Sequence, residues 1–210
     1  MIALIDYGMG NLRSVANAFT ALGETPKVVT DPADLREAHA IVLPGVGAFA
    51  EGMRRLRSLG FVDALEEEVR GNGRPFIGLC LGMQLLASEG WEHGREPGLG
   101  WIPGSVVRIP LTVDGPKIRI PHVGWNDLEV VRRDGLLRDA SASPTFYFVH
   151  SFIFQPTDPS VISGYSTHGT RFASVVESGH VFGTQFHPEK SQRDGLALLK
   201  RFMQLTHSPC

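Results

Sequence analysis

The sequence of 210 residues lacks the features of several specialised protein classes. Two cysteines, Cys80 and Cys210, are too few for a disulfide framework and indicate a reducing, cytoplasmic environment. No apolar run approaches the roughly 20 residues that a membrane helix needs, and no basic segment opens the N-terminus. A formal net charge of -2 offers no basic field for nucleic acid. We therefore expect a cytoplasmic globular protein that binds neither nucleic acid nor a membrane.

Internal repeats, low-complexity tracts and long linkers are also missing from the sequence. We therefore expect a single domain over residues 1–210. Histidines outside the motifs described below are scattered without the spacing of a metal site, so we expect no bound metal.

The pattern of apolar residues predicts the class of fold. In the first half, apolar strand patterns at Ile2–Ile5, Ala40–Leu43 and Pro75–Leu79 alternate with helical patterns such as Leu81–Ser88. The second half is richer in strands, and the chain ends in an amphipathic helix at Arg193–Leu205. This order predicts an α/β fold of three layers, with helices on both faces of a mostly parallel, mixed sheet. Ligands in such folds bind at the carboxyl ends of the strands.

Cys80 stands between a predicted strand and a predicted helix, with Gly78 and Gly82 two residues away on either side. This arrangement is typical of a nucleophile elbow, where the glycines relieve crowding around a strained turn. Unpaired N–H groups at the start of the helix favour the thiolate, and the N–H of Leu81 can face a developing oxyanion. A buried, unreactive cysteine is the alternative that this motif alone leaves open.

His187 and Glu189 lie near the C-terminus, separated by Pro188. The proline restricts His187 to an extended backbone, in which residues two apart face the same side. A thiolate, an imidazole and a carboxylate that orients it form a Cys-His-acid triad. A His-x-Glu pair alone is ordinary in solvated loops, but here it follows a predicted strand, as Cys80 does. The joint pattern makes Cys80, His187 and Glu189 the candidate catalytic residues.

Two segments closely resemble the motifs of class I glutamine amidotransferases: Gly-Leu-Cys-Leu-Gly-Met-Gln at 78–84 and Gln-Phe-His-Pro-Glu-Lys-Ser at 185–191. Pro-Gly-Val-Gly at 44–47 resembles the oxyanion segment of that family. The resemblance spans most of the chain and implies the family's fold and the hydrolysis of glutamine to glutamate and ammonia, without a cofactor. It also implies a glutamine pocket and oxyanion site that include Gly47, Leu81, Gln84, His150 and Ser151.

The resemblance leaves one binding residue open. In the family, a glutamate twelve residues after the nucleophile often holds the substrate amine, and Glu92 occupies that position. The sequence departs from the family here, because Ser-Glu-Gly-Trp-Glu at 88–92 replaces the usual Ser-Glu-Glu run. Glu92 is the candidate, and Glu89 is the alternative.

Three further segments, at 6–12, 121–126 and 147–152, resemble one branch of the family. Members of that branch are glutaminase subunits that pass ammonia to a separate (β/α)8-barrel cyclase in histidine biosynthesis. The cyclase forms imidazole glycerol phosphate and aminoimidazole carboxamide ribotide. The resemblance implies a heterodimer with that cyclase, with these residues facing it: Asn11, Trp125 and Lys190.

Two other functions remain open from the sequence. One is a glutaminase subunit of another class I amidotransferase, such as one serving anthranilate, GMP or pyridoxal phosphate synthesis. The other is a non-catalytic binding protein on the same fold, because a fold does not fix a function.

Overall fold

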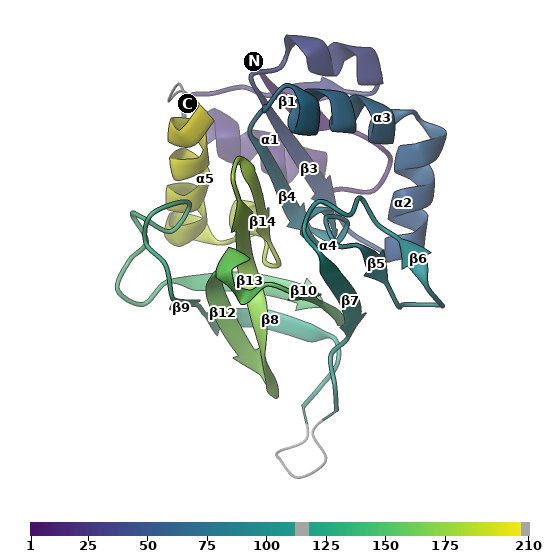
Figure 1. Cartoon of the computed structure of the whole chain (residues 1–210). Helices are drawn as coiled ribbons and strands as arrows, with labels where there is room; N and C mark the ends of the chain where they lie inside the picture. Colours follow the sequence, from purple (N-terminus) through teal and green to yellow (C-terminus); the bar gives the residue numbers. More distant parts are fainter. Residues whose placement is uncertain (112–117, 207–210) are drawn as a thin grey trace.

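A computed structural model describes residues 1–111 and 118–206, so Cys210 lies outside the described residues (Figure 1). Its helices and strands follow in the order β1 (Ile2–Ile5), α1 (Leu12–Ala21), β2 (Lys27–Val29), β3 (Ala40–Gly45), α2 (Phe49–Ser58), α3 (Phe61–Leu65), β4 (Phe76–Cys80), α4 (Leu81–Gln84), β5 (Glu89–Gly90), β6 (Glu96–Pro97), β7 (Gly104–Arg108), β8 (His122–Asp127), β9 (Glu129–Val130), β10 (Thr145–His150), β11 (Phe152–Pro156), β12 (Ile162–His168), β13 (Thr170–Ser178), β14 (Val181–Thr184) and α5 (Gln192–Thr206). Short 3-10 helices cover Pro32–Glu37, Pro159–Val161 and Pro188–Lys190, and a π-helical segment, Glu66–Gly71, continues α3.

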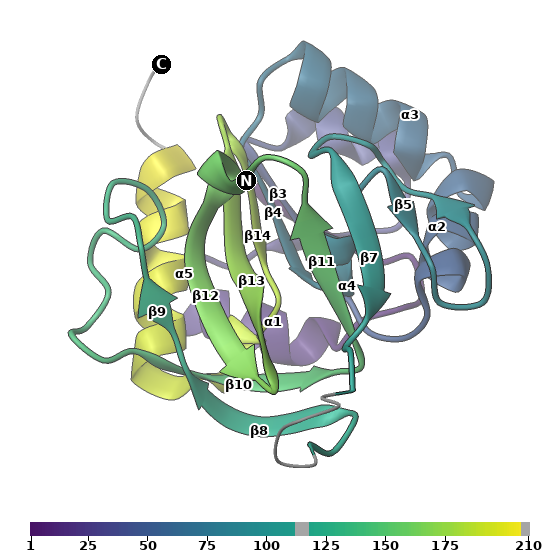
Figure 2. The ribbon, with the colours of Figure 1, turned by 60° about the horizontal axis from the view of Figure 1, so that its bottom comes forward.

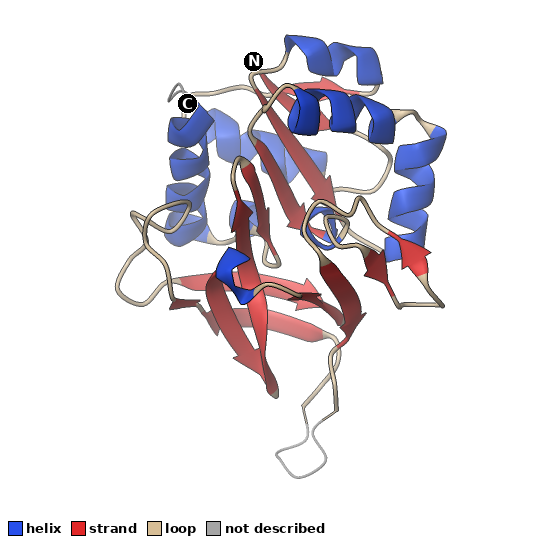
Figure 3. Ribbon diagram, viewed as in Figure 1, coloured by secondary structure: helices blue, strands red, loops and turns tan. Residues whose placement is uncertain are grey.

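Within the described residues, the central sheet has eight strands in the order β2-β1-β3-β4-β14-β13-β12-β9 (Figures 1 and 3). From β2 to β14 neighbouring strands run parallel, and β13, β12 and β9 extend the sheet antiparallel. The mostly parallel, mixed sheet expected from the sequence is confirmed. β3 runs two residues beyond the predicted end at Leu43, because Pro44 and Gly45 pair with Leu79 and Cys80 of β4.

Apolar residues on both faces of the sheet explain the three layers. Successive side chains of a strand point to opposite faces. In β1, Ile2 and Leu4 pack in one core cluster with residues of α1 and α5, whereas Ala3 and Ile5 pack in another with residues of α2 and α3. All four side chains are fully buried. Figure 2 shows α1 and α5 lying away from α2 and α3, with the sheet between the two pairs.

Strands of the second half also pair outside the central sheet. β8 and β10 form an antiparallel pair, and β11, β7, β5 and β6 form a smaller sheet beside α4 (Figure 2). Because β10 ends at His150 and β11 begins at Phe152, a single residue separates strands of two different sheets. This junction lies beside the end of α4, since the side chain of Gln84 donates to the carbonyl oxygen of Phe152.

The helix predicted at 81–88 is shorter in the structure, where α4 ends at Gln84. The carbonyl groups of residues 85–88 accept hydrogen bonds from the backbone N–H groups of residues 98, 99, 100 and 102. The N–H groups of Leu86 and Ala87 reach only three residues back, and the N–H of Ser88 donates to the carbonyl oxygen of Gly104, so the i to i−4 bonds of a second α-helical turn are not made. The prediction was wrong here because bonds to a segment distant along the chain replace that turn.

No helix in residues 1–111 or 118–206 combines the length and apolar character needed to cross a membrane.

Candidate active site

Cys80 adopts the strained backbone expected of a nucleophile elbow. It ends β4 and precedes α4, with φ 55° and ψ −105°, a conformation that residues with a β-carbon rarely adopt. Glycine is required on both sides of Cys80 because the backbone segments approach closely. A β-carbon at Gly78 would collide with the backbone of Gly82, and one at Gly82 would collide with the carbonyl oxygen of Leu43. The turn directs a side chain that is 6% exposed toward a cavity.

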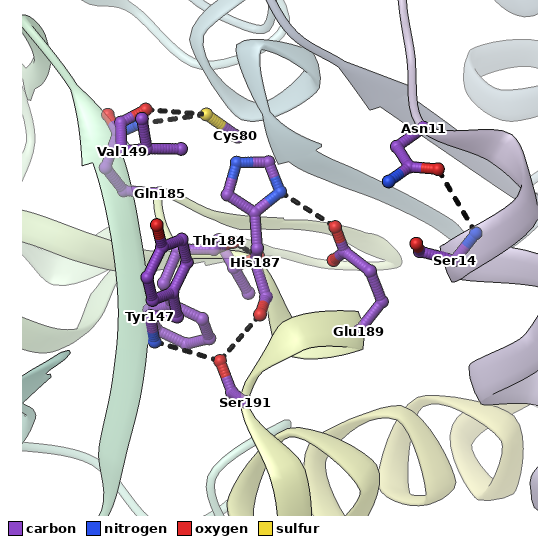
Figure 4. Close-up of polar contacts among 11 residues, drawn as sticks. Asn11, Ser14, Cys80, Tyr147, Val149, Thr184, Gln185, His187, Glu189 and Ser191 are labelled. Carbon is purple, nitrogen blue, oxygen red and sulfur yellow. Dashed lines mark hydrogen bonds and ion pairs between the residues drawn. The ribbon is translucent and has the colours of Figure 1, made fainter. Parts of the chain in front are cut away.

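His187 and Glu189 lie beside this turn because β14 and β4 are parallel neighbours, with Thr184 opposite Leu79. The chain beyond β14 therefore reaches the sheet edge where Cys80 stands. His187 Nδ1 lies 2.8 Å from Glu189 Oε1, so the imidazole donates to the carboxylate (Figure 4). In the described part of the chain, His187 Nε2 has no hydrogen-bond partner, and the Cys80 side chain lies toward that edge of the ring (Figure 4).

The electrostatics of His187 follow from its two neighbours. Burial lowers the pKa of the imidazole, but the proximity of Cys80 and Glu189 outweighs this effect and raises the pKa of His187 to about 10. Both the imidazole and the carboxylate are nearly inaccessible, with side-chain exposures of 4% and 2%. His187 is therefore protonated at neutral pH, with Nδ1 held by Glu189 and the opposite edge of its ring facing Cys80.

A cavity of about 450 Å³ opens in front of Cys80. All six residues that the sequence predicted for substrate or oxyanion binding line it: Gly47, Leu81, Gln84, Glu92, His150 and Ser151. They come from the β3–α2 loop, α4, the segment after β5 and the β10–β11 junction. Segments distant in the sequence thus converge on the thiol.

The structure distinguishes the two candidate carboxylates. Glu92 lines the cavity, and its Oε2 accepts the backbone N–H of Phe49 at 2.8 Å. Phe49 begins α2, whose N-terminus has no side-chain cap from Ala48. Glu89 does not line the cavity and accepts instead from the side chains of Trp91 and Arg95. Of the two carboxylates, Glu92 is therefore the one that faces the cavity.

Two backbone N–H groups flank the thiol as candidate oxyanion donors. Leu81 is the first residue of α4, where backbone N–H groups have no partner within the helix. Gly47 has φ +110°, and its N–H makes no hydrogen bond within residues 1–111 and 118–206. The N–H of Val46 is occupied by the carbonyl oxygen of Met9 at 3.2 Å. Of the two peptides in this loop, the one carrying the Gly47 N–H is thus the available donor.

Comparison with known proteins identifies the family. The sequence-family model described as glutamine amidotransferase class-I matches residues 3–205 of this chain. The chain belongs to the class I glutamine amidotransferase family. The resemblance found in the motifs around Cys80 and His187 is thereby confirmed at the level of the whole chain.

Curated relatives of this amidotransferase cover almost the whole chain. It is 44% identical to imidazole glycerol phosphate synthase subunit HisH 1 of Campylobacter jejuni, over 98% of this chain and 100% of the relative. Identity to subunit HisH of Geobacter sulfurreducens is 45%, over 97% and 98% of the two chains. For subunit HisH of Zymomonas mobilis the identity is 46%, over 96% and 94%.

Solved structures support the same fold. One is described as a crystal structure of glutamine amidotransferase, with a TM-score of 0.76 and 23% identity, over 99% of this chain and 100% of the other. The structure of PurLQS from Thermotoga maritima has a TM-score of 0.74 and 20% identity, over 97% of each chain. At these identities the likeness shows the fold alone.

The candidate partner residues lie on the surface of the amidotransferase. Trp125, on β8, is 49% exposed and contacts the ring of Tyr147, which lies opposite it on β10. Lys190 Nζ lies 5.9 Å from the centre of the same ring. We call Trp125, Tyr147 and Lys190 the aromatic patch. Asn11 is exposed elsewhere, where its side chain accepts from the N–H of Ser14 and caps α1 (Figure 4). Tyr147 was missed in the sequence, where it is one of several aromatic residues in an apolar strand.

The aromatic patch is bonded to the loop that carries His187. The N–H of Tyr147 donates to Ser191 Oγ at 3.0 Å, and that hydroxyl donates to the carbonyl oxygen of His187 at 2.6 Å (Figure 4). In return, the N–H of His187 donates to the carbonyl oxygen of Tyr147 at 2.9 Å. The patch and the imidazole are therefore joined through one hydrogen-bonded stretch of backbone.

His150 contributes a ring surface to the cavity, with both nitrogens engaged within the protein. Nδ1 donates to the carbonyl oxygen of Phe152 at 2.9 Å, so Nε2 accepts the Nδ1–H of His122 at 3.0 Å. Burial lowers the pKa of His150 to about 3, and burial with the nearby His168 lowers the pKa of His122 to about 4. Both histidines are therefore neutral at physiological pH. Residues 1–111 and 118–206 contain no cluster suited to a metal ion.

Proposed function

We propose that this chain is the glutaminase subunit of an imidazole glycerol phosphate synthase, a single cytoplasmic domain of residues 1–210. The observation that carries the proposal is the 44–46% identity, over nearly all of the chain, to relatives named as HisH subunits of that synthase. The subunit hydrolyses glutamine and delivers ammonia to a (β/α)8-barrel cyclase. The cyclase uses the ammonia to form imidazole glycerol phosphate and aminoimidazole carboxamide ribotide in histidine biosynthesis.

The first half of the proposed reaction releases ammonia. The thiolate of Cys80 attacks the side-chain amide carbon of glutamine, forming a C–S bond and a tetrahedral oxyanion. The N–H groups of Leu81 and Gly47 donate to that oxyanion. The imidazolium of His187 then gives its Nε2 proton to the departing nitrogen as the C–N bond breaks. The buried carboxylate of Glu189, 2.8 Å from Nδ1, stabilises the imidazolium and holds the required tautomer.

The second half restores the thiol site. Neutral His187 takes a proton from water, whose oxygen attacks the thioester carbon. The C–S bond breaks, and glutamate leaves with Cys80 and His187 again forming a thiolate–imidazolium pair. The cavity lining supports the choice of substrate: Glu92 offers a carboxylate for the α-amine, and Gln84, which uses both amide protons within the protein, offers only its carbonyl oxygen.

The aromatic patch supports a partner at this side of the molecule. Exposed Trp125 and the cation of Lys190 lie beside Tyr147, and Trp and Tyr are enriched among the residues that anchor protein interfaces. Because Tyr147 is bonded to the His187 loop, cyclase binding would be felt at the triad. The proposal includes control by the partner, in which the isolated chain is a slow glutaminase. When the occupied cyclase binds, the peptide group that joins Val46 to Gly47 rotates, and its N–H completes the oxyanion site.

The alternative, a glutaminase serving another biosynthetic pathway, has weaker support. Solved relatives described as a GMP synthase component from Thermoplasma acidophilum and as PurLQS are 17% and 20% identical to this chain, which supports the fold but not a shared substrate.

The test uses Cys80→Ala in the complex with the cyclase. We expect glutamine-dependent formation of imidazole glycerol phosphate to disappear while synthesis from added ammonium salt continues, because the thiol only generates ammonia. Glutamate release from wild type is measured alone, with cyclase, and with cyclase and nucleotide. Survival of glutaminase activity in Cys80→Ala would remove the thiol from its role. Equal wild-type rates in all three conditions would refute control by the partner.

A further inference from the structure

Gln185 lies next to the nucleophile because of the register of two strands. Thr184 at the end of β14 lies opposite Leu79 of β4, so Gln185 and Cys80, each one residue further on, are neighbours. The Gln185 side chain is fully buried, and its Nε2 lies 3.7 Å from Cys80 Sγ (Figure 4). This distance is within the range of a hydrogen bond to sulfur.

A backbone carbonyl fixes which end of the Gln185 amide faces the thiol. The carbonyl oxygen of Phe152 can only accept, so the Gln84 group 3.0 Å from it is Nε2. The same nitrogen lies 3.0 Å from the amide oxygen of Gln185. With its oxygen taken by Gln84, Gln185 presents its N–H group to Cys80 Sγ.

Pairing between strands does not explain why residue 185 carries an amide side chain. The backbone N–H of Gln185 donates to the carbonyl oxygen of Ser174 at 2.9 Å, a bond that any non-proline residue would make. The adjacent Phe186 is equally buried and apolar. A buried amide costs free energy unless its polar atoms are bonded, and here the N–H group reaches the thiol.

The Cys80 thiol has a second polar neighbour, whose effect on a thiolate is opposite to that of the Gln185 amide. Cys80 Sγ lies 4.0 Å from the carbonyl oxygen of Val149, which accepts from the protonated thiol (Figure 4). That oxygen repels a thiolate, whereas an amide N–H attracts one, and hydrogen bonds to charged groups are about twice as strong as neutral ones. We infer that Gln185 is a positioning residue that donates to the thiolate of Cys80 and holds it for attack on the amide carbon. The inference rests on the proposed glutaminase function.

The sharpest test is Gln185→Glu, which keeps the volume and the oxygen that accepts from Gln84 but removes the donor. Losing a hydrogen bond to a charged group costs about 1.5–3 kcal/mol, which corresponds to roughly a 10- to 150-fold loss of kcat. We expect KM for glutamine to stay within about threefold. Gln155→Glu, at an exposed glutamine of β11, is the matched control and should match wild type.

A second measurement separates positioning from a structural role. Alkylation of Cys80 by iodoacetamide is followed at pH 8 in a Cys210→Ser background, where a single thiol remains. We expect alkylation to slow in the order wild type, Gln185→Met, Gln185→Glu, because Met only removes the donor and Glu adds a negative charge. A merely structural role predicts a loosened site that reacts as fast or faster, and that result would overturn the inference.

The remaining outcomes are also decisive. Unchanged kcat in a folded Gln185→Glu variant would overturn the inference. Loss of ammonium-dependent synthesis in both Gln185 variants would also overturn it, because that result would show that Gln185 is needed for the folded structure. Absence of glutaminase activity in the wild-type complex would instead refute the proposed function.

Discussion

Replacing Glu189 by glutamine removes one charge from the site and leaves its shape. The carboxylate accepts the Nδ1–H of His187 at 2.8 Å, and its other oxygen is buried without a partner in the described part of the chain. A glutamine amide fits in two ways. With oxygen toward Nδ1, the NH2 group is a buried donor without a partner. With nitrogen toward Nδ1, the imidazole must carry its proton on Nε2, the edge that faces Cys80.

Both arrangements weaken the site, and the size of the effect can be worked out. Loss of a hydrogen bond to a charged group costs about 1.5–3 kcal/mol, and an unsatisfied buried donor costs about 1–3 kcal/mol more. At about 1.4 kcal/mol per factor of ten, Glu189→Gln should lower kcat for glutamine roughly 10²- to 10⁴-fold. The variant also lowers the pKa of His187 from about 10 toward its ordinary value of 6.5. Since the imidazolium must donate to the departing nitrogen, the alkaline limb of activity moves to lower pH.

The assay is glutamate release by the complex with cyclase between pH 6 and 10.5. Glu37→Gln, at an exposed carboxylate in the 3-10 helix Pro32–Glu37, is the matched control. Ammonium-dependent synthesis at pH 8 checks that the complex is folded. A kcat within twofold of wild type, with the alkaline limb unmoved, would refute the reasoning about Glu189.

Three further predictions follow from the cavity and the aromatic patch. Glu92→Gln should raise KM for glutamine roughly 10- to 100-fold, because a charged partner of the amine is lost, while Glu89→Gln stays within twofold; equal effects would show that the choice of carboxylate is wrong. Gly47→Ala should slow glutamine hydrolysis without affecting ammonium-dependent synthesis, because φ +110° is strained for alanine and its β-carbon would lie 2.9 Å from Met9 Cε; wild-type rates would exclude this loop from the reaction. Trp125→Ala and Lys190→Glu should weaken cyclase binding in titration calorimetry, the former by about 2 kcal/mol; unchanged affinity and ammonia transfer in both would contradict the interface.

Local sequence patterns predicted the parts of the site that depend on a few neighbouring residues. The glycines around Cys80 predicted the turn, because contact between Gly78 and Gly82 is decided within five residues. Pro188 and the spacing of His187 and Glu189 likewise predicted a contact within one short segment. The family resemblance, rather than any pattern of polarity, brought in the residues that line the cavity.

Features that depend on distant segments could not be predicted in the same way. The end of α4 depends on the backbone bond from Ser88 to the distant Gly104, which no helix signal reports. Gln185 reaches Cys80 through the register of β4 and β14, about 100 residues apart, and its amide orientation depends on the carbonyl of Phe152. In the sequence Gln185 is the first residue of the motif at 185–191, and nothing in that motif indicates a contact with Cys80. Tyr147 likewise becomes part of the aromatic patch only because Trp125 lies opposite it in the β8–β10 pair.

The left-handed backbone at Cys80 sets stability and activity against each other at one residue. A side chain with a β-carbon at φ 55° costs on the order of 1–3 kcal/mol, which glycine would avoid. Selection for a more heat-resistant fold alone would therefore favour glycine at position 80 and remove the thiol. Replacing Cys80 by glycine should therefore abolish glutamine hydrolysis while it relieves the backbone strain at this turn.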